Sequence, residues 1–412
     1  MTSRTMVAVV DTTDADAEFP TAKNPHGWRC VMRWGSETHQ KVGGYSLKPK
    51  STTMTDSLSA RIVLAKTTAG KTCTRLMARR ILRAMTLLTM LFSCCSIHRD
   101  VPDGAIILND YPEISGDPSV LVDNAAFTNR MFYTSPNIVR LQGAISQSVS
   151  DDLVSWQPVN AGMEQYGRGT VLVGLVGQWH EQLETAYCIE HLGTYYLYYC
   201  GYPNVGWPTN PGKIGVATSA DGLAFTHQTG PILDVTPDKH DANGLYSPVV
   251  IRYSGEFLMV YAAQCYASAT ITPGFYIMAA TSADGLSWTK DVTPVLSPDA
   301  GVSYMVNGVA EPDLILGPDG KYYLFFTGNL GDTETRCIAV ARATSPLGPY
   351  TVGGIVFEAT PDTFNQDGVL APTVIVDGSV LKMWYLTSRF SGGPETHSVG
   401  YTELAWPLSV FP

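Results

Sequence analysis

A nine-residue pattern recurs along this chain and constrains its fold more than any other feature. The pattern is Asn or Asp, Gly, an aliphatic residue, two variable positions, Pro, two further residues and Ile; it occupies residues 243–251, 307–315 and 367–375. A short turn and an aromatic-rich run follow each copy, which predicts two consecutive strands. Fainter copies at 116–122 and 184–189 give a spacing of about sixty to seventy residues, typical of propeller blades.

A second pair of strands closes each unit. Ala-Asp-Gly-Leu turns at 220–223 and 283–286 lie between alternating apolar runs. They are hairpin signals, because Asp-Gly readily adopts the positive backbone angles of a tight turn. Four antiparallel strands per unit and five units predict an all-β, five-bladed β-propeller over residues 104–408, whose innermost strands line a central channel.

Charge and cysteine content narrow the partners. The net charge of −10 argues against nucleic acid, since nucleic-acid-binding modules concentrate positive charge. Cys188, Cys200, Cys265 and Cys337 show no metal-type spacing and are expected in the core. Cys188 and Cys200 fall on adjacent expected strands, so a disulfide in an oxidising compartment is an alternative.

The first hundred residues differ in character from the rest. Residues 1–76 are polar and show no sustained period, so we expect either a disordered extension or an over-extended reading frame whose true start is Met77. Residues 77–94 have a basic start and a short apolar core, the layout of a signal peptide. Leu91-Phe92-Ser93-Cys94 is similar to a lipobox, which predicts an exported protein, secreted or at the cell surface or periplasm, with lipidation at Cys94. An ordinary amphipathic or buried helix is the alternative.

Candidate functional residues occupy the position before the repeat's proline, where several blades meet at the channel. Around the ring this position holds Asp117, Thr185, Ser247, Glu311 and Ala371. In the second copy Ala186 replaces the proline, and Glu184 precedes Thr185. We therefore expect three carboxylates from three blades to converge. The alternative for any one of them is a turn residue that accepts backbone hydrogen bonds.

The entries Asp-Pro-Ser-Val and Glu-Pro-Asp-Leu-Ile, the strand Gly-Lys-Tyr-Tyr-Leu-Phe-Phe and the hairpin Ala-Thr-Ser-Ala-Asp-Gly-Leu-Ser-Trp carry a resemblance. Over residues 116–403 the chain resembles the five-bladed propeller glycoside hydrolases, a group with families 43 and 32 and the related phosphorylases of family 130. These motifs specify the fold well and the substrate poorly.

The family 43 resemblance implies an Asp base, a middle-blade Asp that orients substrate, and a Glu general acid. Asp117 matches the base, or a nucleophile, by its Asp-Pro context, and Glu311 lies in the blade expected for the acid. Family acids often lie two residues before the proline; Glu184 has that offset and is the alternative acid or third carboxylate. Ser247 replaces the middle Asp, and Asp241 lies a few residues upstream.

Substrate-binding candidates are aromatic, imidazole and carboxylate side chains near the expected channel mouth, where aromatic faces could bury the apolar face of a sugar. They are Trp179, His180, Glu181, Trp207, His240 and Asp241. We expect no cofactor; a structural calcium or other ion in the channel is an alternative.

The sequence thus predicts a glycosidase, arabinanase-, xylosidase- or fructosidase-like, that cleaves an oligo- or polysaccharide with a carboxylate acid and base. Two carboxyl groups are needed because one protonates the leaving oxygen while the other activates water or attacks the sugar. The alternatives are a non-catalytic carbohydrate-binding surface protein and a glycoside phosphorylase, which would need a basic anion pocket. Sugar, linkage, stereochemistry and oligomeric state stay open.

Overall fold

The computed structural model describes residues 8–9, 31–32, 105–106, 116–123, 128–137, 142–203, 210–266, 270–330, 335–361, 363–389 and 396–411. The chain divides into the units Met1–Ile97 and His98–Pro412. In the first unit the described part is one antiparallel pair, β1 (Ala8–Val9) and β2 (Val31–Met32). The predicted signal peptide and Cys94 lie outside the described residues.

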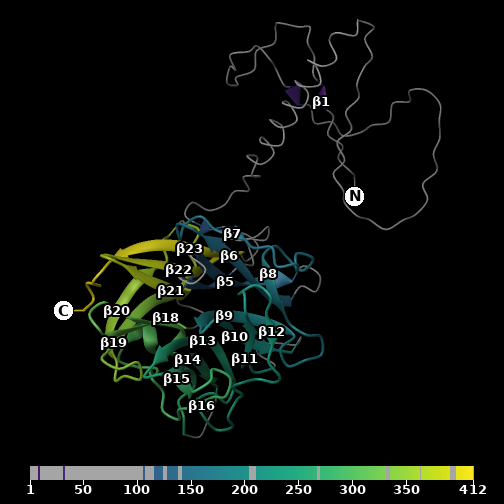
Figure 1. Cartoon of the computed structure of the whole chain (residues 1–412). Helices are drawn as coiled ribbons and strands as arrows, with labels where there is room; N and C mark the ends of the chain where they lie inside the picture. The colour runs from purple at the N-terminus through teal and green to yellow at the C-terminus, as the bar shows by residue number, and fades with distance from the viewer. Residues whose placement is uncertain are drawn as a thin grey trace, which may run out of the picture. The chain divides into compact units, whose positions relative to one another are not determined.

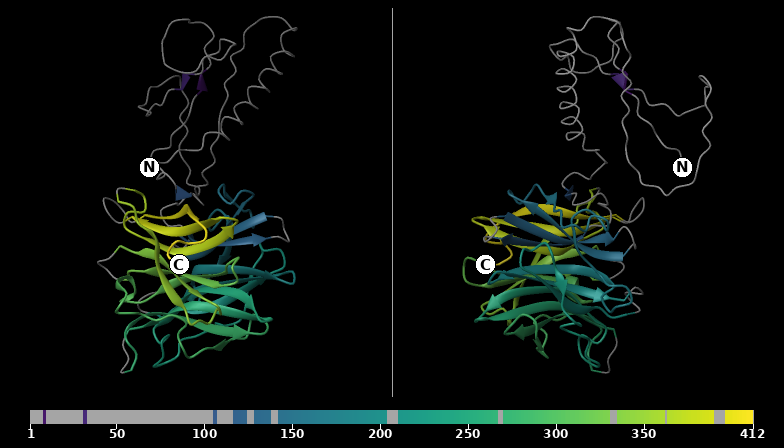
Figure 2. Two further views of the ribbon diagram at one scale, coloured as in Figure 1. Left: turned by 90° about the vertical axis from the view of Figure 1, so that its left-hand side faces the viewer. Right: turned by 45° about the vertical axis from the view of Figure 1, so that its right-hand side comes forward.

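The second unit folds into five antiparallel sheets, which follow one another in chain order around a ring, with the yellow last sheet beside the blue first one (Figures 1 and 2). This arrangement confirms the predicted all-β, five-bladed propeller.

The strands of the five blades have the following bounds. Blade 1 consists of β4 (Gly116–Asp123), β5 (Thr128–Asn137), β6 (Gln142–Ser150), β7 (Gln157–Pro158) and β8 (Thr170–Val173). Blade 2 consists of β9 (Gln182–His191), β10 (Thr194–Tyr202), β11 (Lys213–Ser219) and β12 (Thr226–His227). Blade 3 consists of β13 (Gly244–Tyr253), β14 (Glu256–Cys265), β15 (Gly274–Ser282) and β16 (Thr289–Lys290). After the 3-10 turn η1 (Ser303–Met305), blade 4 consists of β17 (Ala310–Leu316), β18 (Tyr322–Gly328), β19 (Cys337–Ala343) and β20 (Thr351–Glu358). Blade 5 consists of β21 (Val369–Asp377), β22 (Val380–Arg389), β23 (Thr396–Ala405) and β3 (Ala105–Ile106).

Two features of the ring go beyond the repeat. The outermost strand of blade 5 is β3, which comes from the start of the unit and pairs with β23 through Ile106 and Val399. The ring is therefore closed by joining the two ends of the domain in one sheet. In blade 1 the outer strand is split into β7 and β8, both of which pair with β6.

The hairpin turns hold themselves together through short polar side chains. In blade 3, Ser282 Oγ accepts the amides of Asp284 and Gly285, and Asp284 Oδ1 accepts those of Leu286 and Ser287 at 2.8 and 2.7 Å. These bonds lower the pKa of Asp284 to about 2, since they favour the ionised carboxylate. The predicted Asp-Gly turns thus form as expected, with serine as an additional cap.

The core lies between neighbouring blades and is rich in large aromatic side chains. Alternating side chains of β10 pack against the two neighbouring blades: Tyr199 lies in the hydrophobic cluster with blade 1, and Tyr198 lies in the cluster with blade 3. Cys188 and Cys200 are buried thiols in this region, and no disulfide joins them. The disulfide alternative is therefore wrong, and the prediction of core cysteines is confirmed.

Candidate active site at the propeller channel

All five inner strands carry the same irregularity at the same place. The pairing of each inner strand with its neighbour shifts at the residue before the proline or its equivalent. The five residues at this position have φ between 47° and 50°, although none is glycine; they are Asp117, Thr185, Ser247, Glu311 and Ala371. Such angles are uncommon for side-chain-bearing residues, and bulges of this kind re-aim side chains near active sites.

The five bulges converge on one pocket in the channel. Its lining comes from all five inner strands: the bulge residue and the proline or its equivalent in every blade, and also the following residue in blades 2 to 5. Asp117 of blade 1 and Glu311 of blade 4 both line this pocket, as do Thr185, Ser247 and Ala371. The structure therefore brings together the two carboxylates that the sequence selected as the acid and base.

Asp117 is electrostatically coupled to both other predicted carboxylates. Burial, the charge of Glu311 and the charge of Glu184 raise the pKa of Asp117 to about 7, and a hydrogen bond from Thr134 opposes this rise. Thr134 Oγ1 lies 2.8 Å from Asp117 Oδ2. Like charges near a carboxylate disfavour its ionisation, so the two neighbouring carboxylates help to keep a proton on Asp117.

Glu311 is anchored by two donors on a single oxygen. Oε2 accepts the hydroxyl of Thr327 at 2.7 Å and the backbone amide of Ala371, in the next blade, at 3.1 Å. The carboxylate is thereby fixed in direction by its own blade and its neighbour.

Glu184 occupies a different position from the other two. It precedes Thr185, which holds the bulge position of blade 2, and it is not among the residues that line the pocket. Its Oε1 accepts a short hydrogen bond from the hydroxyl of Tyr202. Burial raises the pKa of Glu184, and the bond from Tyr202 lowers it. Glu184 is thus placed to act on Asp117 through its charge.

Asp313 is a buried channel carboxyl that the sequence reasoning missed. It is 3% exposed, lines the same pocket two residues after Glu311, and accepts the amides of Leu314 at 3.0 Å and Val374 at 2.7 Å. Burial raises the pKa of Asp313 to about 7, against the effect of the two amides. The bond to Val374 links blade 4 to blade 5. In the sequence pattern, Asp313 is one of the two unspecified residues after the proline, so the repeat gave no signal for it.

Trp179 and His180 pack over blade 2. The Trp179 ring stacks on Tyr199 at 6.2 Å, and the ring of His180 lies 4.5 Å from His227. His180 is 5% exposed, and neither ring nitrogen has a hydrogen-bond partner. Glu181 is also buried, and its Oε2 accepts the amide of Gly177 at 2.8 Å. None of the three is in the pocket lining, so their predicted sugar contacts have no support from this placement.

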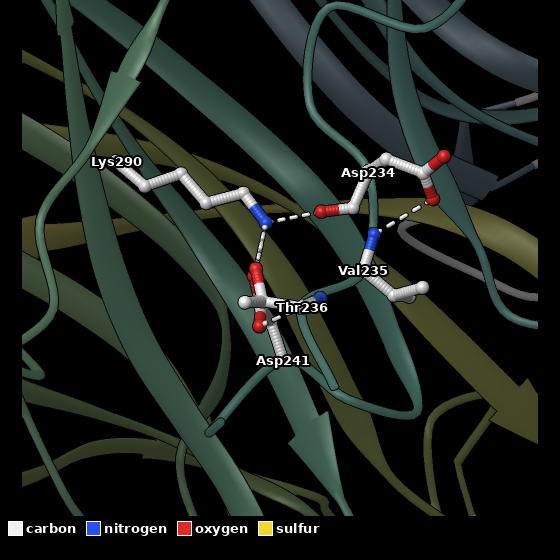
Figure 3. A network of polar contacts seen from close by, with 5 residues as sticks. All are labelled: Asp234, Val235, Thr236, Asp241 and Lys290. Atoms are coloured by element: carbon white, nitrogen blue, oxygen red, sulfur yellow. Dashed lines mark hydrogen bonds and ion pairs between the residues drawn. The ribbon is translucent and has the colours of Figure 1, made fainter. Parts of the chain in front are cut away.

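Asp241 belongs to a polar network that joins the loop before β13 to the outer strand β16 of blade 3 (Figure 3). Its carboxylate forms a short ion pair with Lys290 of β16 and accepts the amide of Thr236 at 3.2 Å. Lys290 also donates to Thr236 Oγ1 at 2.9 Å and to the carbonyl of Asp234. Asp241 therefore fixes the loop at residues 234–236 to the outer strand of blade 3, and it is not among the residues that line the channel pocket.

His240 and Trp207 are the two remaining residues that were predicted to contact sugar. His240 packs edge-on against Tyr276 at 4.6 Å and is not in the pocket lining. Trp207 lies outside the described residues.

Two further observations concern the described residues alone. They contain no group of three or more His, Cys, Asp or Glu side chains arranged to hold a metal ion. Within the same ranges, no helix has the length and hydropathy that a membrane crossing requires.

Comparison with known proteins rests on structure. No protein-family model matches the chain, and no curated protein sequence matches it. A solved glycoside hydrolase is similar at a TM-score of 0.58 and 15% identity, over 73% of this chain and 91% of that one. A thermostable family-43 glycoside hydrolase gives 0.55 and 21%, over 74% and 98%. An N-acetylgalactosamine deacetylase from F. plautii, in complex with blood group B trisaccharide, gives 0.52 and 13%, over 74% and 95%.

These similarities confirm the predicted resemblance in fold to the five-bladed propeller glycoside hydrolases. At such identities they concern the fold alone. The deacetylase also shows that the same architecture occurs with a different reaction, so function must be argued from the site.

Proposed function

We propose that this protein hydrolyses a glycosidic bond in an oligo- or polysaccharide bound at the channel. The observation that carries the proposal is that Asp117 and Glu311 stand on equivalent bulges of two blades and line one pocket. Two carboxyl groups at one site, one as acid and one as base or nucleophile, are what glycoside cleavage requires. This pair stands on a fold that a solved family-43 glycoside hydrolase shares.

In the proposed reaction Glu311 is the general acid and Asp117 the base or nucleophile. Glu311 donates a proton to the glycosidic oxygen as the bond to the sugar carbon breaks. Asp117 then takes a proton from the attacking water, or attacks the carbon itself and is released by water. In sum, one water is consumed and a free reducing end and an alcohol are produced. Glu184 is the alternative acid, and otherwise acts as the third charge that raises the pKa of Asp117.

Hydrolysis is favoured over phosphorolysis by the residues around the site. A phosphorylase must bind an inorganic anion, usually with Arg or Lys donors. Among the described residues, the pocket lining carries Asp117, Glu311 and Asp313 but no lysine or arginine. An anion beside these carboxylates would meet charge repulsion.

The test is a panel of aryl furanosides, aryl pyranosides and plant or algal polysaccharides, incubated with and without phosphate. The control is the double variant Asp117→Asn/Glu311→Gln. Release of reducing sugar or chromophore by the wild type alone, independent of phosphate, supports hydrolysis and identifies the sugar class. Phosphate-dependent release would indicate a phosphorylase. Sugar binding without turnover would indicate a carbohydrate-binding protein, the reading that Ser247 at the middle position favours.

Export and lipid attachment at Cys94 stay predictions from the sequence. Mass spectrometry of the mature amino terminus would check them, because cleavage before Cys94 and an acyl mass on that residue are both expected.

A further inference from the structure

We propose that Thr134 and Thr327 are positioning residues that each fix one carboxylate oxygen and so direct the other oxygen of Asp117 and of Glu311 towards the substrate. This inference rests on the proposed hydrolysis, since it assigns a role to the residues behind the two reacting groups. Neither threonine belongs to the channel pocket lining.

The geometry in blade 1 fixes where the hydroxyl proton of Thr134 goes. Thr134 Oγ1 lies 3.0 Å from the amide nitrogen of Thr185 and 2.8 Å from Asp117 Oδ2. The amide can only donate, so the hydroxyl oxygen accepts from it and the single hydroxyl proton is available for Asp117. Asp117 Oδ2 is thereby kept as an acceptor, and a proton taken up in the reaction goes to Oδ1.

Blade 4 repeats this arrangement around Glu311. Thr327 Oγ1 lies 3.0 Å from the amide nitrogen of Ala371 and 2.7 Å from Glu311 Oε2. The same amide also lies 3.1 Å from Oε2. Two donors therefore occupy Oε2, so the proton that Glu311 delivers must sit on Oε1.

The other three blades show that the threonine accompanies the carboxylate. After each bulge, strand pairing resumes between Ser119 and Phe132 in blade 1 and between Asp313 and Phe325 in blade 4. Thr134 lies two residues after Phe132, and Thr327 lies two residues after Phe325. The residues at the equivalent position of the second strand are Cys200 in blade 2, Ala262 in blade 3 and Leu386 in blade 5. The bulge residues of those blades are not acidic. A hydroxyl thus occurs at this position only in the two blades that present a carboxylate at the bulge, among strands that the structure describes.

The experiment removes each hydroxyl while keeping the side-chain shape. Thr134→Val and Thr327→Val are compared with Thr134→Ser and Thr327→Ser, which restore the donor. The matched control is Thr387→Val, a buried threonine of β22 whose hydroxyl donates to the carbonyl of Phe364 at 3.0 Å and touches no carboxylate. Every variant is made in the full chain, and the kcat and KM for the substrate found in the panel are measured.

A second readout does not depend on activity. The pKa of Asp117 is followed by carbon-13 NMR of aspartate carboxyl groups, with the signal identified through Asp117→Asn. Because the hydrogen bond from Thr134 lowers this pKa, its loss in Thr134→Val should raise the pKa above about 7, and Thr134→Ser should restore it.

The proposal predicts that kcat falls about tenfold or more in both valine variants while KM changes much less, because hydrogen bonds to charged groups are the stronger ones. Thr387→Val should keep the wild-type kcat. An unchanged Asp117 pKa in Thr134→Val, or an equal loss of kcat in Thr387→Val, would overturn it. If the wild type cleaves no glycoside, the proposed function fails, and the NMR titration still decides whether Thr134 holds Asp117.

Discussion

The backbone amide of Ala371 donates a hydrogen bond to Glu311 Oε2 at 3.1 Å, so a carboxylate of blade 4 is held by the main chain of blade 5. Blades 1 and 2 are linked in the same way, through the amide of Thr185 and the hydroxyl of Thr134 at 3.0 Å. The position of each channel carboxylate therefore depends on the packing of the next blade. Blade 5, which holds Glu311 through this amide, is also the blade that β3 completes when the ring closes.

The first prediction concerns the pH dependence of activity. Asp117 must be ionised to act as base or nucleophile, so kcat/KM should rise with pH through about 7 in the free enzyme. In Glu184→Gln a like charge near Asp117 is removed, so the midpoint of this rise should move to lower pH. A pH–rate profile of both proteins checks this, and a midpoint that moves upward would refute the coupling.

The second prediction is that the fold becomes more stable without the channel charge. The pKa of Asp117 is raised to about 7 in the folded protein from about 3.9 in the unfolded chain, so the folded state binds more protons between these values and stability falls as pH rises through this window. Asp117→Asn should therefore raise the free energy of unfolding at pH 8 by up to about 4 kcal/mol, because each pKa unit corresponds to about 1.4 kcal/mol.

Urea denaturation at pH 8 and pH 4 measures this effect. At pH 4 the gain should vanish, because Asp117 is protonated in the folded state there. A gain of the same size at both pH values would mean that it does not come from the charge.

A third prediction separates a structural role of Asp241 from sugar binding. Lys290→Ala leaves the buried carboxylate of Asp241 without its ion pair, which should cost about 3 kcal/mol in the free energy of unfolding. Sugar affinity and kcat should stay within twofold of wild type. Lys382→Ala serves as the control, because its partner Asp377 is 65% exposed and such pairs contribute about 1 kcal/mol or less. Loss of sugar binding in Lys290→Ala would instead assign Asp241 to the site.

The fourth prediction concerns the imidazole pair of blade 2, the buried His180 and the half-buried His227. The Nε2 of His227 faces the carbonyl of Val173 at 3.0 Å, so Nε2 carries the proton and Nδ1 accepts from the hydroxyl of Tyr199 at 2.8 Å. His180 packs on the ring of His227, and burial, followed by electrostatic repulsion from His227, lowers the pKa of His180 to about 4.

The unfolded chain binds a proton at His180 below about pH 6.5, so this residue weakens the fold as pH falls from there to about 4. His180→Phe keeps the ring packing and removes an unpaired buried polar group, so it should stabilise the protein, by about 1 kcal/mol or more at pH 5. Thermal melts at pH 5 and pH 8 would show a larger gain at pH 5. Destabilisation at both values would mean that the imidazole makes a contact that phenylalanine cannot.

The blade count and the channel position of Asp117 and Glu311 could be predicted because the repeat itself marks them. A proline at constant spacing identifies the entry of each inner strand, and the residue before it must then face the channel. The shared bulge and its positive φ at five residues were not predictable, since Thr185, Ser247 and Ala371 have no intrinsic preference for this conformation.

The partners of the carboxylates were missed for a related reason. Thr134 and Thr327 stand in aromatic-rich strands, and only the bulge register brings them to Asp117 and Glu311. Asp241 illustrates the opposite error: nearness in sequence to Ser247 suggested the channel, whereas the loop carries its side chain to Lys290. Closure through β3 depends on a two-residue strand too short to give a sequence signal.

The most direct test of the proposed reaction compares aryl glycosides with poor and good leaving groups in Glu311→Gln, Glu184→Gln and the wild type. A general acid matters only when the leaving oxygen needs a proton, so Glu311→Gln should lose about a hundredfold or more in kcat/KM on a phenyl glycoside and less than about tenfold on a dinitrophenyl glycoside. Glu184→Gln should show no such difference between the two substrates. Equal losses on both substrates in Glu311→Gln, or the leaving-group dependence appearing in Glu184→Gln, would contradict the assignment of Glu311 as the acid.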